Sequence, residues 1–186
     1  MIGFAFCGSF CTHKTALEQM QRLIELGYDI LPIMSENVYS TDTRFGSCRD
    51  LRAHVEIMCG KEIVHTIVDA EPLGPKTPLD ALVICPCTGN TLAKMAHGIT
   101  DTSVTMAAKA HLRGDRPLVI TLASNDALSA NLKNIAQLLC RKHVYFVPLS
   151  QDDPISKPHS LVADFSLLVP TLDSALKGKQ YQKVFV

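Results

Sequence analysis

The chain has 186 residues, 47% of them hydrophobic and 19% charged, and this composition excludes intrinsic disorder, a collagen-like repeat and a coiled coil. Its 18 Lys and Arg residues balance its 18 Asp and Glu residues, which argues against nucleic acid or an anionic membrane as the main partner. The length predicts one domain, residues 1–186, that buries most of its apolar surface.

Apolar runs that predict buried strands alternate along the chain with segments of helical period. In chain order, the sequence predicts a strand over 2–7, a helix over 16–24, a strand over 29–34, a helix over 47–60, a strand over 63–68, a loop over 71–78, a strand over 81–85, helices over 90–97 and 101–112, a strand over 117–123, a helix over 132–140, a strand over 144–149 and a closing helix over 161–176. Gly27 and Gly60 stand where helix C-caps belong, and Ser47 suits an N-cap. Pro32 places its strand at an edge or a bulge.

This alternation predicts an α/β fold, a Rossmann-like three-layer sandwich with a mostly parallel sheet built by right-handed crossovers. In such a sheet the ligand crevice lies beyond the carboxyl ends of the strands. The loops expected there are rich in small hydroxyl or amide side chains, and they span residues 8–12, 35–40, 86–91, 124–127 and 150–154.

The loop after the first predicted strand suits a phosphate. Gly8 allows a ligand to approach the backbone closely, and the hydroxyls of Ser9 and Thr12 stand beside free helix N–H groups. The loop matches neither a GxGxxG fingerprint nor a Walker loop, and a plain tight turn has a similar sequence.

The segment Pro86–Thr91 (PCTGNT) follows the most buried strand and precedes a helix. It offers two hydroxyls, a permissive glycine at Gly89 and the amide of Asn90, which suits the edge of a planar heterocycle. Ordinary helix capping by Thr88 or Asn90 explains one of these residues but not the whole set.

Other chemistry has little support in the sequence. The seven histidines show no metal-binding spacing, so no metal site is expected, and a Gly-x-Ser-x-Gly elbow is missing. The seven cysteines lack CxxC spacing and are expected to be small buried hydrophobes in a reducing cytosol. Asp152 and Asp153 are expected to be solvated turn residues, with a functional role as the alternative.

The sequence has neither a membrane-spanning apolar run nor a complete signal peptide, which favours the cytoplasm and excludes a membrane protein.

The segment 86–101 (PCTGNTLAKMAHGITD) resembles the flavin-binding signature of the homo-oligomeric flavin-containing cysteine decarboxylase family, a flavoprotein family in which Pro-x-Ser/Thr-x-Asn-Thr precedes Lys-x-Ala-x-Gly-x-x-Asp. The residues that fill these places are Pro86, Thr88, Asn90, Thr91, Lys94, Ala96, Gly98 and Asp101. The resemblance implies a homo-oligomer, which the zero net charge also favours. It further implies FMN, or only a phosphate at a remnant flavin site, bound by Gly8, Ser9, Thr12, Ser35, Pro86, Thr88, Gly89, Asn90, Thr91 and Asn125.

Two features depart from the decarboxylases of that family. They carry a catalytic His shortly before the strand that corresponds to residues 81–85, where this chain has EPLGPKTPLD. Their Pro-x-Met-Asn clamp over the substrate corresponds to residues 123–125, which retain only Asn125. The departures argue against cysteine decarboxylation, and no catalytic residue is predicted.

A narrower set of motifs is similar to the family of dipicolinate synthase B subunits. The set comprises TRFG (43–46), AEPLGPK (70–76), TGN (88–90), MAAKA (106–110), NDAL (125–128) and QDDP (151–154). This resemblance implies a cytoplasmic enzyme in the mother cell of a spore-forming bacterium, working with an A subunit that binds NADP. Together the two subunits would act as an oxidoreductase that converts a dihydrodipicolinate-type precursor to dipicolinate during sporulation.

Arg44 and Lys76, which lie in two of these motifs, are the best available cations for the carboxylates of a diacid substrate, with solvated surface charge as the alternative. Two other functions stay open. One is an autonomous FMN-dependent decarboxylase or flavin prenyltransferase, the latter echoed by residues 116–135. The other is a non-catalytic partner subunit, because the loops hold few acid–base residues.

Overall fold

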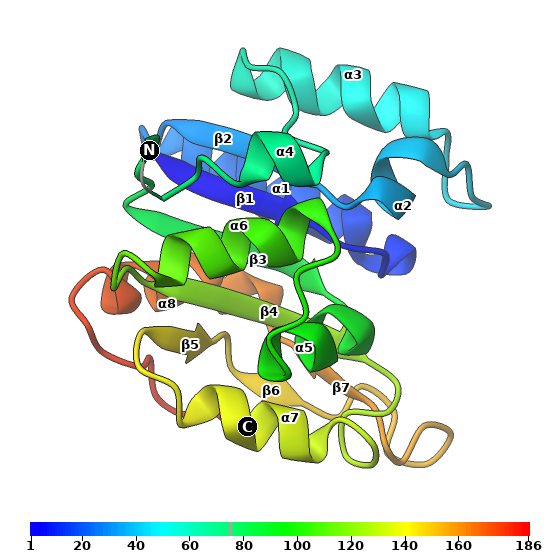
Figure 1. Cartoon of the computed structure of the whole chain (residues 1–186). Helices are drawn as coiled ribbons and strands as arrows, with labels where there is room; N and C mark the ends of the chain where they lie inside the picture. The colour runs from blue at the N-terminus through cyan, green and yellow to red at the C-terminus, as the bar shows by residue number, and fades with distance from the viewer. Residues whose placement is uncertain (75) are drawn as a thin grey trace.

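The computed structural model describes residues 1–74 and 76–186, and its strands form one seven-stranded sheet (Figure 1). The strand order is β2-β1-β3-β4-β7-β6, and β5 also pairs with β4. The strands are β1 (Ile2–Phe6), β2 (Ile30–Met34), β3 (Ala81–Cys87), β4 (Leu118–Ser124), β5 (Val144–Phe146), β6 (Leu149–Ser150) and β7 (Leu161–Ala163). The strands β1 to β5 pair in parallel, whereas β7 runs antiparallel to β4 and β6, which confirms the mostly parallel sheet.

Helices cover both faces of this sheet, which confirms the three-layer sandwich. They are α1 (His13–Glu25), α2 (Glu36–Ser40), α3 (Cys48–Cys59), α4 (Ile67–Ala70), α5 (Gly89–Ala96), α6 (Ser103–Leu112), α7 (Leu132–Leu139) and α8 (Leu168–Ala175), with short 3-10 helices η1 (Phe10–Thr12) and η2 (Phe165–Leu167). In Figure 1, α4 to α7 lie in front of the sheet, α1 and α8 lie behind it, and α3 lies beyond the edge strand β2. No helix in the described part of the chain combines the length and the apolar character needed to cross a bilayer.

The central strands form the core because every residue of β1, β3 and β4 is buried. The rings of Phe4 and Phe6 are fully buried, with their centroids 5.1 Å apart. Burying one such side chain stabilises the fold by about 1.5–3 kcal/mol. A close-packed centre of this kind fixes the ends of the strands, and therefore the loops that extend from them.

The cysteines divide between the core and the surface. Cys7, Cys85 and Cys87 are buried, as predicted. Cys48 and Cys59 are half-buried. Cys11 and Cys140 are exposed, so the prediction of buried cysteines is wrong for these two. Both occupy helical or turn positions on the outside of the sandwich, where neighbouring elements do not cover them.

The predicted caps Ser47 and Gly60 and the predicted edge strand are confirmed, whereas the C-cap of α1 is Leu26, with Gly27 as the next residue. The Ser47 hydroxyl accepts a hydrogen bond of 3.1 Å from the Arg49 N–H at the start of α3. Gly60 ends α3 with a φ of +62°, a conformation that favours glycine. The strand that contains Pro32 lies at one end of the sheet, where a missing backbone donor is tolerated.

The predicted strand over residues 63–68 is wrong. Only Val64 bridges to Ile33 of β2, and α4 begins three residues later. The cause is local, because the Thr66 hydroxyl accepts a hydrogen bond of 3.1 Å from the Asp69 N–H and caps a helix.

Two further predictions near the C-terminus differ from the structure. The predicted strand 144–149 is divided into β5 and β6 by Val147 and Pro148, and proline has no N–H to continue the pairing. The predicted helix 161–176 begins late, because its first three residues form β7. Asp164 then accepts a hydrogen bond of 3.0 Å from the Ser166 N–H, and the helical segment starts there.

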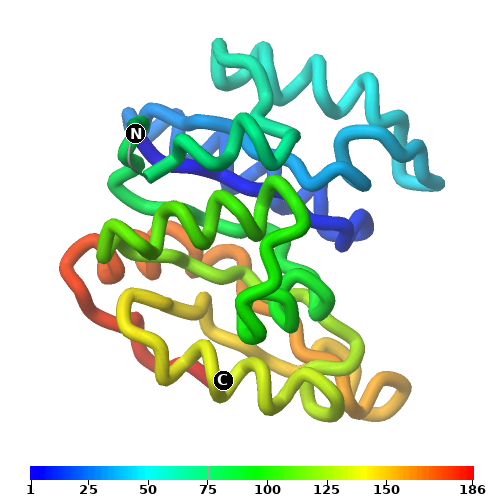
Figure 2. Tube along the Cα trace, viewed as in Figure 1, coloured from blue at the N-terminus to red at the C-terminus, as the bar shows by residue number. Residues whose placement is uncertain are grey.

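The order of the strands places a crevice between β1 and β3. The chain moves from β1 outward to β2 and then crosses back to β3, so the loops after β1 and β3 diverge at this point of the sheet. Figure 2 shows the turn after β1 and the loop after α2 on the same side of the molecule, at the carboxyl ends of these strands.

Candidate functional site

A cavity of about 500 Å³ lies at the carboxyl ends of β1, β2 and β3, and we call it the crevice pocket. It is lined by Gly8, Phe10, Ser35, Glu36, Asn37, Thr88, Asn90, Thr91, Lys94, Asp101 and Thr102. Five of the predicted cofactor-binding residues are among them: Gly8, Ser35, Thr88, Asn90 and Thr91. The structure therefore brings together three loops that were predicted separately.

The loop after β1 leaves space and hydrogen-bond donors for a ligand. A Cβ atom on Gly8 would meet only the Phe10 ring at 3.7 Å and Thr88 Cγ2 at 4.0 Å, both ordinary contacts. The chain's own packing therefore does not require glycine at this position. The N–H groups of Gly8 and Ser9 donate to no acceptor in the described part of the chain. Free N–H groups beside an open glycine suit an anion such as a phosphate.

The loop after β3 is held by a chain of hydrogen bonds. The Thr88 hydroxyl caps α5 by accepting from the Thr91 N–H at 3.1 Å, and it donates to Thr91 Oγ1 at 3.1 Å. Thr91 Oγ1 in turn donates to Cys7 Sγ at 3.3 Å. Burial raises the pKa of the Cys7 thiol to about 11, so this thiol stays protonated near neutral pH.

Asn90, unlike Thr88 and Thr91, takes no part in this chain of hydrogen bonds. Its side chain is exposed in the crevice pocket and forms no hydrogen bond with the described residues. Its amide can therefore donate to and accept from a ligand. Capping by Thr88 accounts for the start of α5 and leaves Asn90 without a structural duty.

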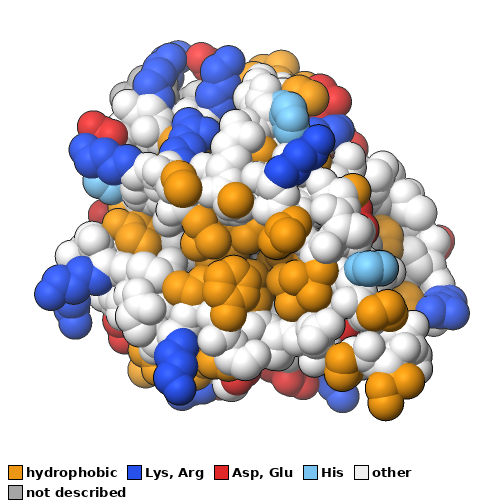
Figure 3. All heavy atoms as spheres, turned by 90° about the horizontal axis from the view of Figure 1, so that it is seen from below, with side chains coloured by type: hydrophobic (Ala, Val, Ile, Leu, Met, Phe, Trp, Pro, Cys, Tyr) orange, Lys and Arg blue, Asp and Glu red, His pale blue; other side chains and the backbone are white. Residues whose placement is uncertain are grey.

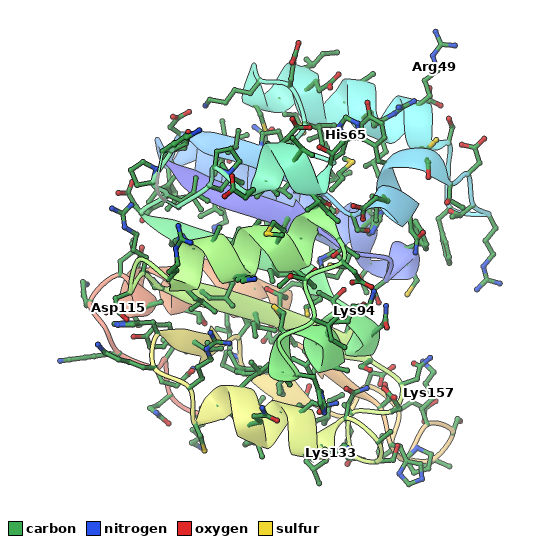
Figure 4. The ribbon with its side chains drawn as sticks, in the orientation of Figure 1. Arg49, His65, Lys94, Asp115, Lys133 and Lys157 are labelled. Carbon is green, nitrogen blue, oxygen red and sulfur yellow. The ribbon has the colours of Figure 1, made fainter. Side chains whose placement is uncertain are left out.

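Three charged side chains line the crevice pocket, and sequence reasoning did not assign them to the site. Lys94 Nζ lies 2.8 Å from Asp101 Oδ1, and this pairing lowers the pKa of the Asp101 carboxyl. Figure 4 shows Lys94 on α5, on the side where the strands end. Glu36 accepts a hydrogen bond of 2.9 Å from the Ser103 N–H at the start of α6. Two carboxylates against one ammonium leave the pocket with a formal charge of −1.

The remaining predicted residues of the first loop hold the loop itself. Ser9 Oγ donates to the Ala123 carbonyl at 3.3 Å and links the loop to the end of β4. Thr12 Oγ1 donates to the Ser9 carbonyl at 2.8 Å. Ser9 and Thr12 are not among the residues that line the crevice pocket.

Pro86, Gly89 and Asn125 also lie outside the crevice pocket. Pro86 is buried within β3, and its carbonyl accepts from the Cys7 N–H at 3.2 Å. A Cβ atom on Gly89 would lie 2.3 Å from Ser124 Oγ, so this glycine allows α5 to pack closely against the loop after β4. Asn125 is exposed in that loop.

The two predicted substrate-binding cations lie far apart in the fold. Arg44 is exposed in the turn Thr43–Gly46, and its Cζ atom lies 4.9 Å from the centroid of the Phe45 ring. Lys76 lies in the loop that leads into β3, and so at the amino ends of the strands, on the opposite side from the crevice pocket. Pro75 of the same motif lies outside the described residues.

A second cavity of about 390 Å³ adjoins the turn that carries Arg44, and we call it the hairpin pocket. Thr43, Phe45 and Gly46 line it, together with the first turns of α1 and α3. Phe10 lines both this cavity and the crevice pocket. The two cavities are therefore neighbours, separated by one aromatic ring.

The titratable groups of the crevice pocket offer little acid–base chemistry. Lys94 and Asp101 are paired with each other, and Glu36 is held by the start of α6. Asp152 and Asp153 lie elsewhere, in a turn where Asp152 pairs with Lys157 at 2.9 Å and Asp153 accepts from the Ser156 N–H. The arrangement is suited to binding and orienting a polar ligand rather than to removing a proton from carbon.

Comparison with known proteins agrees with this geometry. A family model described as Flavoprotein matches residues 1–165. The dipicolinate synthase B subunit of Bacillus subtilis (strain 168) is 44% identical over 185 residues, which cover 100% of this chain and 92% of that protein. The crystal structure of the dipicolinate synthase B subunit from Bacillus halodurans C superimposes with a TM-score of 0.92 at 45% identity, covering 100% of this chain and 95% of that one. The FMN-dependent cysteine decarboxylase SpaF superimposes with a TM-score of 0.67 at 25% identity, covering 95% and 94%.

Proposed function

The chain belongs to the flavoprotein family, and from this premise we propose that it acts as the B subunit of a dipicolinate synthase. The observation that carries the proposal is the similarity to two such subunits along the whole chain, at 44% and 45% identity. In this proposal the chain works with an NADP-binding A subunit. The pair oxidises a dihydrodipicolinate-type precursor to dipicolinate in the cytoplasm of the mother cell during sporulation.

FMN is the proposed ligand of the crevice pocket. The FMN-dependent relative SpaF has the same fold, and the open position at Gly8 leaves room for a ligand beside free N–H groups. The backbone N–H groups of Gly8 and Ser9 would hold the phosphate, and Ser35, Thr88 and Asn90 would hold polar groups of the rest of the molecule. When bound, FMN supplies a group that accepts or donates a hydride equivalent. A remnant site that binds only phosphate is the alternative use of the same residues.

The A subunit has a separate task in this proposal. The chain carries no GxGxxG fingerprint, so a dinucleotide such as NADP is assigned to the partner. The crevice pocket contributes polar groups from the loops and helix starts that follow β1, β2 and β3. This division of labour explains why the pocket has so few groups for proton transfer.

A homo-oligomer is also part of the proposal. Apolar side chains gather on the face seen from below (Figure 3), where α7 and the C-terminus lie in Figure 1. Exposed apolar residues of these two elements are Leu132, Phe185 and Val186. A contiguous apolar patch marks an interaction site in most proteins, and the zero net charge gives no repulsion against self-association.

Reconstitution from the two purified subunits tests the proposed function. We expect neither subunit alone to produce dipicolinate from the precursor with NADP, and we expect the mixture to produce it. Full activity of the A subunit alone would make this chain a non-catalytic partner. Full activity of this chain alone would favour an autonomous flavoenzyme. The visible absorption spectrum of the purified chain, taken after incubation with FMN and gel filtration, distinguishes a flavin site from a phosphate-only site.

A further inference from the structure

The hairpin pocket has no assigned ligand, and its lining is mainly apolar. Leu17 of α1, Val38 of α2 and Leu51 of α3 form its inner wall, and Phe10 and Phe45 flank it. Its volume of about 390 Å³ lies in the range of small-molecule sites, which is roughly 300–1,000 Å³. Apolar and aromatic walls of this kind suit a flat ring.

The charge of the hairpin pocket contrasts with that of the crevice pocket. Lys14 is the one Lys, Arg, Asp or Glu residue among the described residues that line it. His13 also lines it, but burial lowers the pKa of its imidazole, which stays neutral near pH 7. The crevice pocket holds two carboxylates, Glu36 and Asp101, against the single cation Lys94.

Lys14 has no structural partner that explains its position. It is exposed and forms no ion pair with any residue that the structure describes. It lies in the first turn of α1, a turn without any acidic side chain. A cation near a helix N-terminus interacts unfavourably with the helix dipole, so the stability of α1 does not account for Lys14.

The turn Thr43–Gly46 carries a second cation, Arg44, between residues that line the same pocket. Two backbone hydrogen bonds of 3.0 and 3.1 Å between Thr43 and Gly46 close the turn. Gly46 has a φ of +146°, a backbone conformation that residues other than glycine rarely adopt. The shape of the turn therefore depends on this glycine. Arg44 and Phe45 occupy its tip, and the Phe45 side chain is 54% exposed.

The neighbouring carboxylate does not neutralise these cations inside the pocket. Asp42 accepts a hydrogen bond of 2.8 Å from the Cys48 N–H, and this contact lowers the pKa of the Asp42 carboxyl. Asp42 therefore serves the start of α3, and it does not line the hairpin pocket.

From these observations we propose that the hairpin pocket is the subsite for a ring that carries two carboxylates, with Lys14 as its specificity-determining residue. Lys14 binds one carboxylate, Arg44 in the adjoining turn binds the other, and the apolar wall and Phe45 hold the ring. Phe10 separates this subsite from the crevice pocket, so a ring in one cavity lies next to a cofactor in the other. This inference rests on the proposed function for the identity of the diacid.

Binding of dipicolinate to the full chain tests the inference without requiring turnover. We expect calorimetry to detect dipicolinate more strongly than picolinate, which has one carboxylate. Loss of one charge-assisted contact weakens binding by about tenfold or more, so Lys14→Met should do the same, and Lys14→Arg should restore most of the affinity. The melting temperature of Lys14→Met without ligand should stay unchanged or rise, which separates a binding role from a structural one.

Lys133→Met is the matched control. Lys133 is the second residue of α7, as Lys14 is the second residue of α1, and it is exposed and without an ion pair in the described structure. Figure 4 shows it on α7, and it is not among the residues that line either pocket. We expect dipicolinate affinity to be unchanged in this variant.

The possible outcomes separate the inference from the proposed function. If Lys14→Met keeps the wild-type affinity, or if only Lys94→Met weakens dipicolinate, the diacid does not use the hairpin pocket and the inference is wrong. If reconstituted wild-type subunits make dipicolinate while Lys14→Met leaves KM unchanged, the function stands and the inference falls. If the subunits make no dipicolinate but binding depends on Lys14, the subsite stands and the proposed function falls.

Discussion

The Nε2 atom of His13 lies 2.7 Å from the carbonyl oxygen of Cys7. Because a carbonyl oxygen only accepts, Nε2 carries the proton and donates it. The bond joins the first residue of α1 to the residue after β1, and the loop with Gly8 lies between them. The two ends of the proposed phosphate loop are therefore held by one buried imidazole.

This buried imidazole predicts a loss of stability in mild acid. Burial lowers the pKa of His13, and it lowers that of His111, whose Nε2 donates to the Pro117 carbonyl at 2.8 Å. Between the folded pKa and the unfolded value of about 6.5, the unfolded chain binds more protons. The free energy of unfolding should therefore fall as the pH drops below about 6.5.

Urea denaturation at a series of pH values measures this effect. His111→Gln keeps a donor for the Pro117 carbonyl and does not titrate, so its free energy of unfolding should depend less on pH in this range. The carboxylates with lowered pKa values, such as Asp101 and Asp126, lose their contribution only at lower pH. Equal pH slopes for His111→Gln and the wild type would contradict the prediction for His111.

Gly8→Val should abolish binding of FMN or phosphate while the fold stays intact. The backbone of Gly8 has an ordinary φ, and a Cβ atom there makes only ordinary contacts, so the side chain should occupy ligand space. Fluorescence titration with FMN and calorimetry with inorganic phosphate measure the loss. Gly8→Ala should show a smaller loss, and unchanged affinity in Gly8→Val would remove Gly8 from the site.

Gly89→Ala, in contrast to Gly8→Val, should first of all lower the free energy of unfolding. The new Cβ atom would lie 2.3 Å from Ser124 Oγ, 2.6 Å from Asn131 Nδ2 and 2.8 Å from Asp126 Oδ1, so α5 or the following loop must shift. Overpacking of this kind costs about 1–3 kcal/mol. Denaturation of the variant measures the cost, and wild-type stability would show that the loop moves without strain.

The exposed apolar side chains near the C-terminus, Phe185 among them, predict self-association. Light scattering after size exclusion should give a mass several times that of the 20.3 kDa chain at micromolar concentration. Phe185→Glu should shift the population toward smaller species, because a charge within an apolar contact is costly. A wild-type monomer would contradict the predicted homo-oligomer.

The sequence was informative wherever a local pattern decides the structure. The apolar run at β1, the Ser47 cap and the left-handed Gly60 each depend on a few neighbouring residues, and all three are confirmed. The start of the helix predicted over residues 161–176 was wrong, because its first residues pair with the end of β4, a contact between distant segments. Hydrophobic period alone does not distinguish a short buried strand from the start of a buried helix.

The charged residues of the crevice pocket could not be predicted from local patterns in the sequence, because their positions depend on contacts between different elements. Glu36 is positioned by a hydrogen bond from the Ser103 N–H at the start of α6. Lys94 is positioned by its ion pair with Asp101, which lies in the link between α5 and α6. The placement of Lys76, by contrast, was predictable. A loop that leads into a parallel strand lies at its amino end, opposite the crevice, and the topological rule already applied to the other loops gives that answer.

The contact between Glu36 and the Ser103 N–H has a practical consequence for spectroscopy. A side chain that lines the crevice holds a single backbone amide of α6 at 2.9 Å. The rate at which that amide proton exchanges with deuterated solvent depends on how firmly the carboxylate is held. A ligand that engages Glu36 changes this rate and the amide's chemical shift. The Ser103 amide is thus a native reporter of crevice occupancy, readable without a dye or a turnover assay.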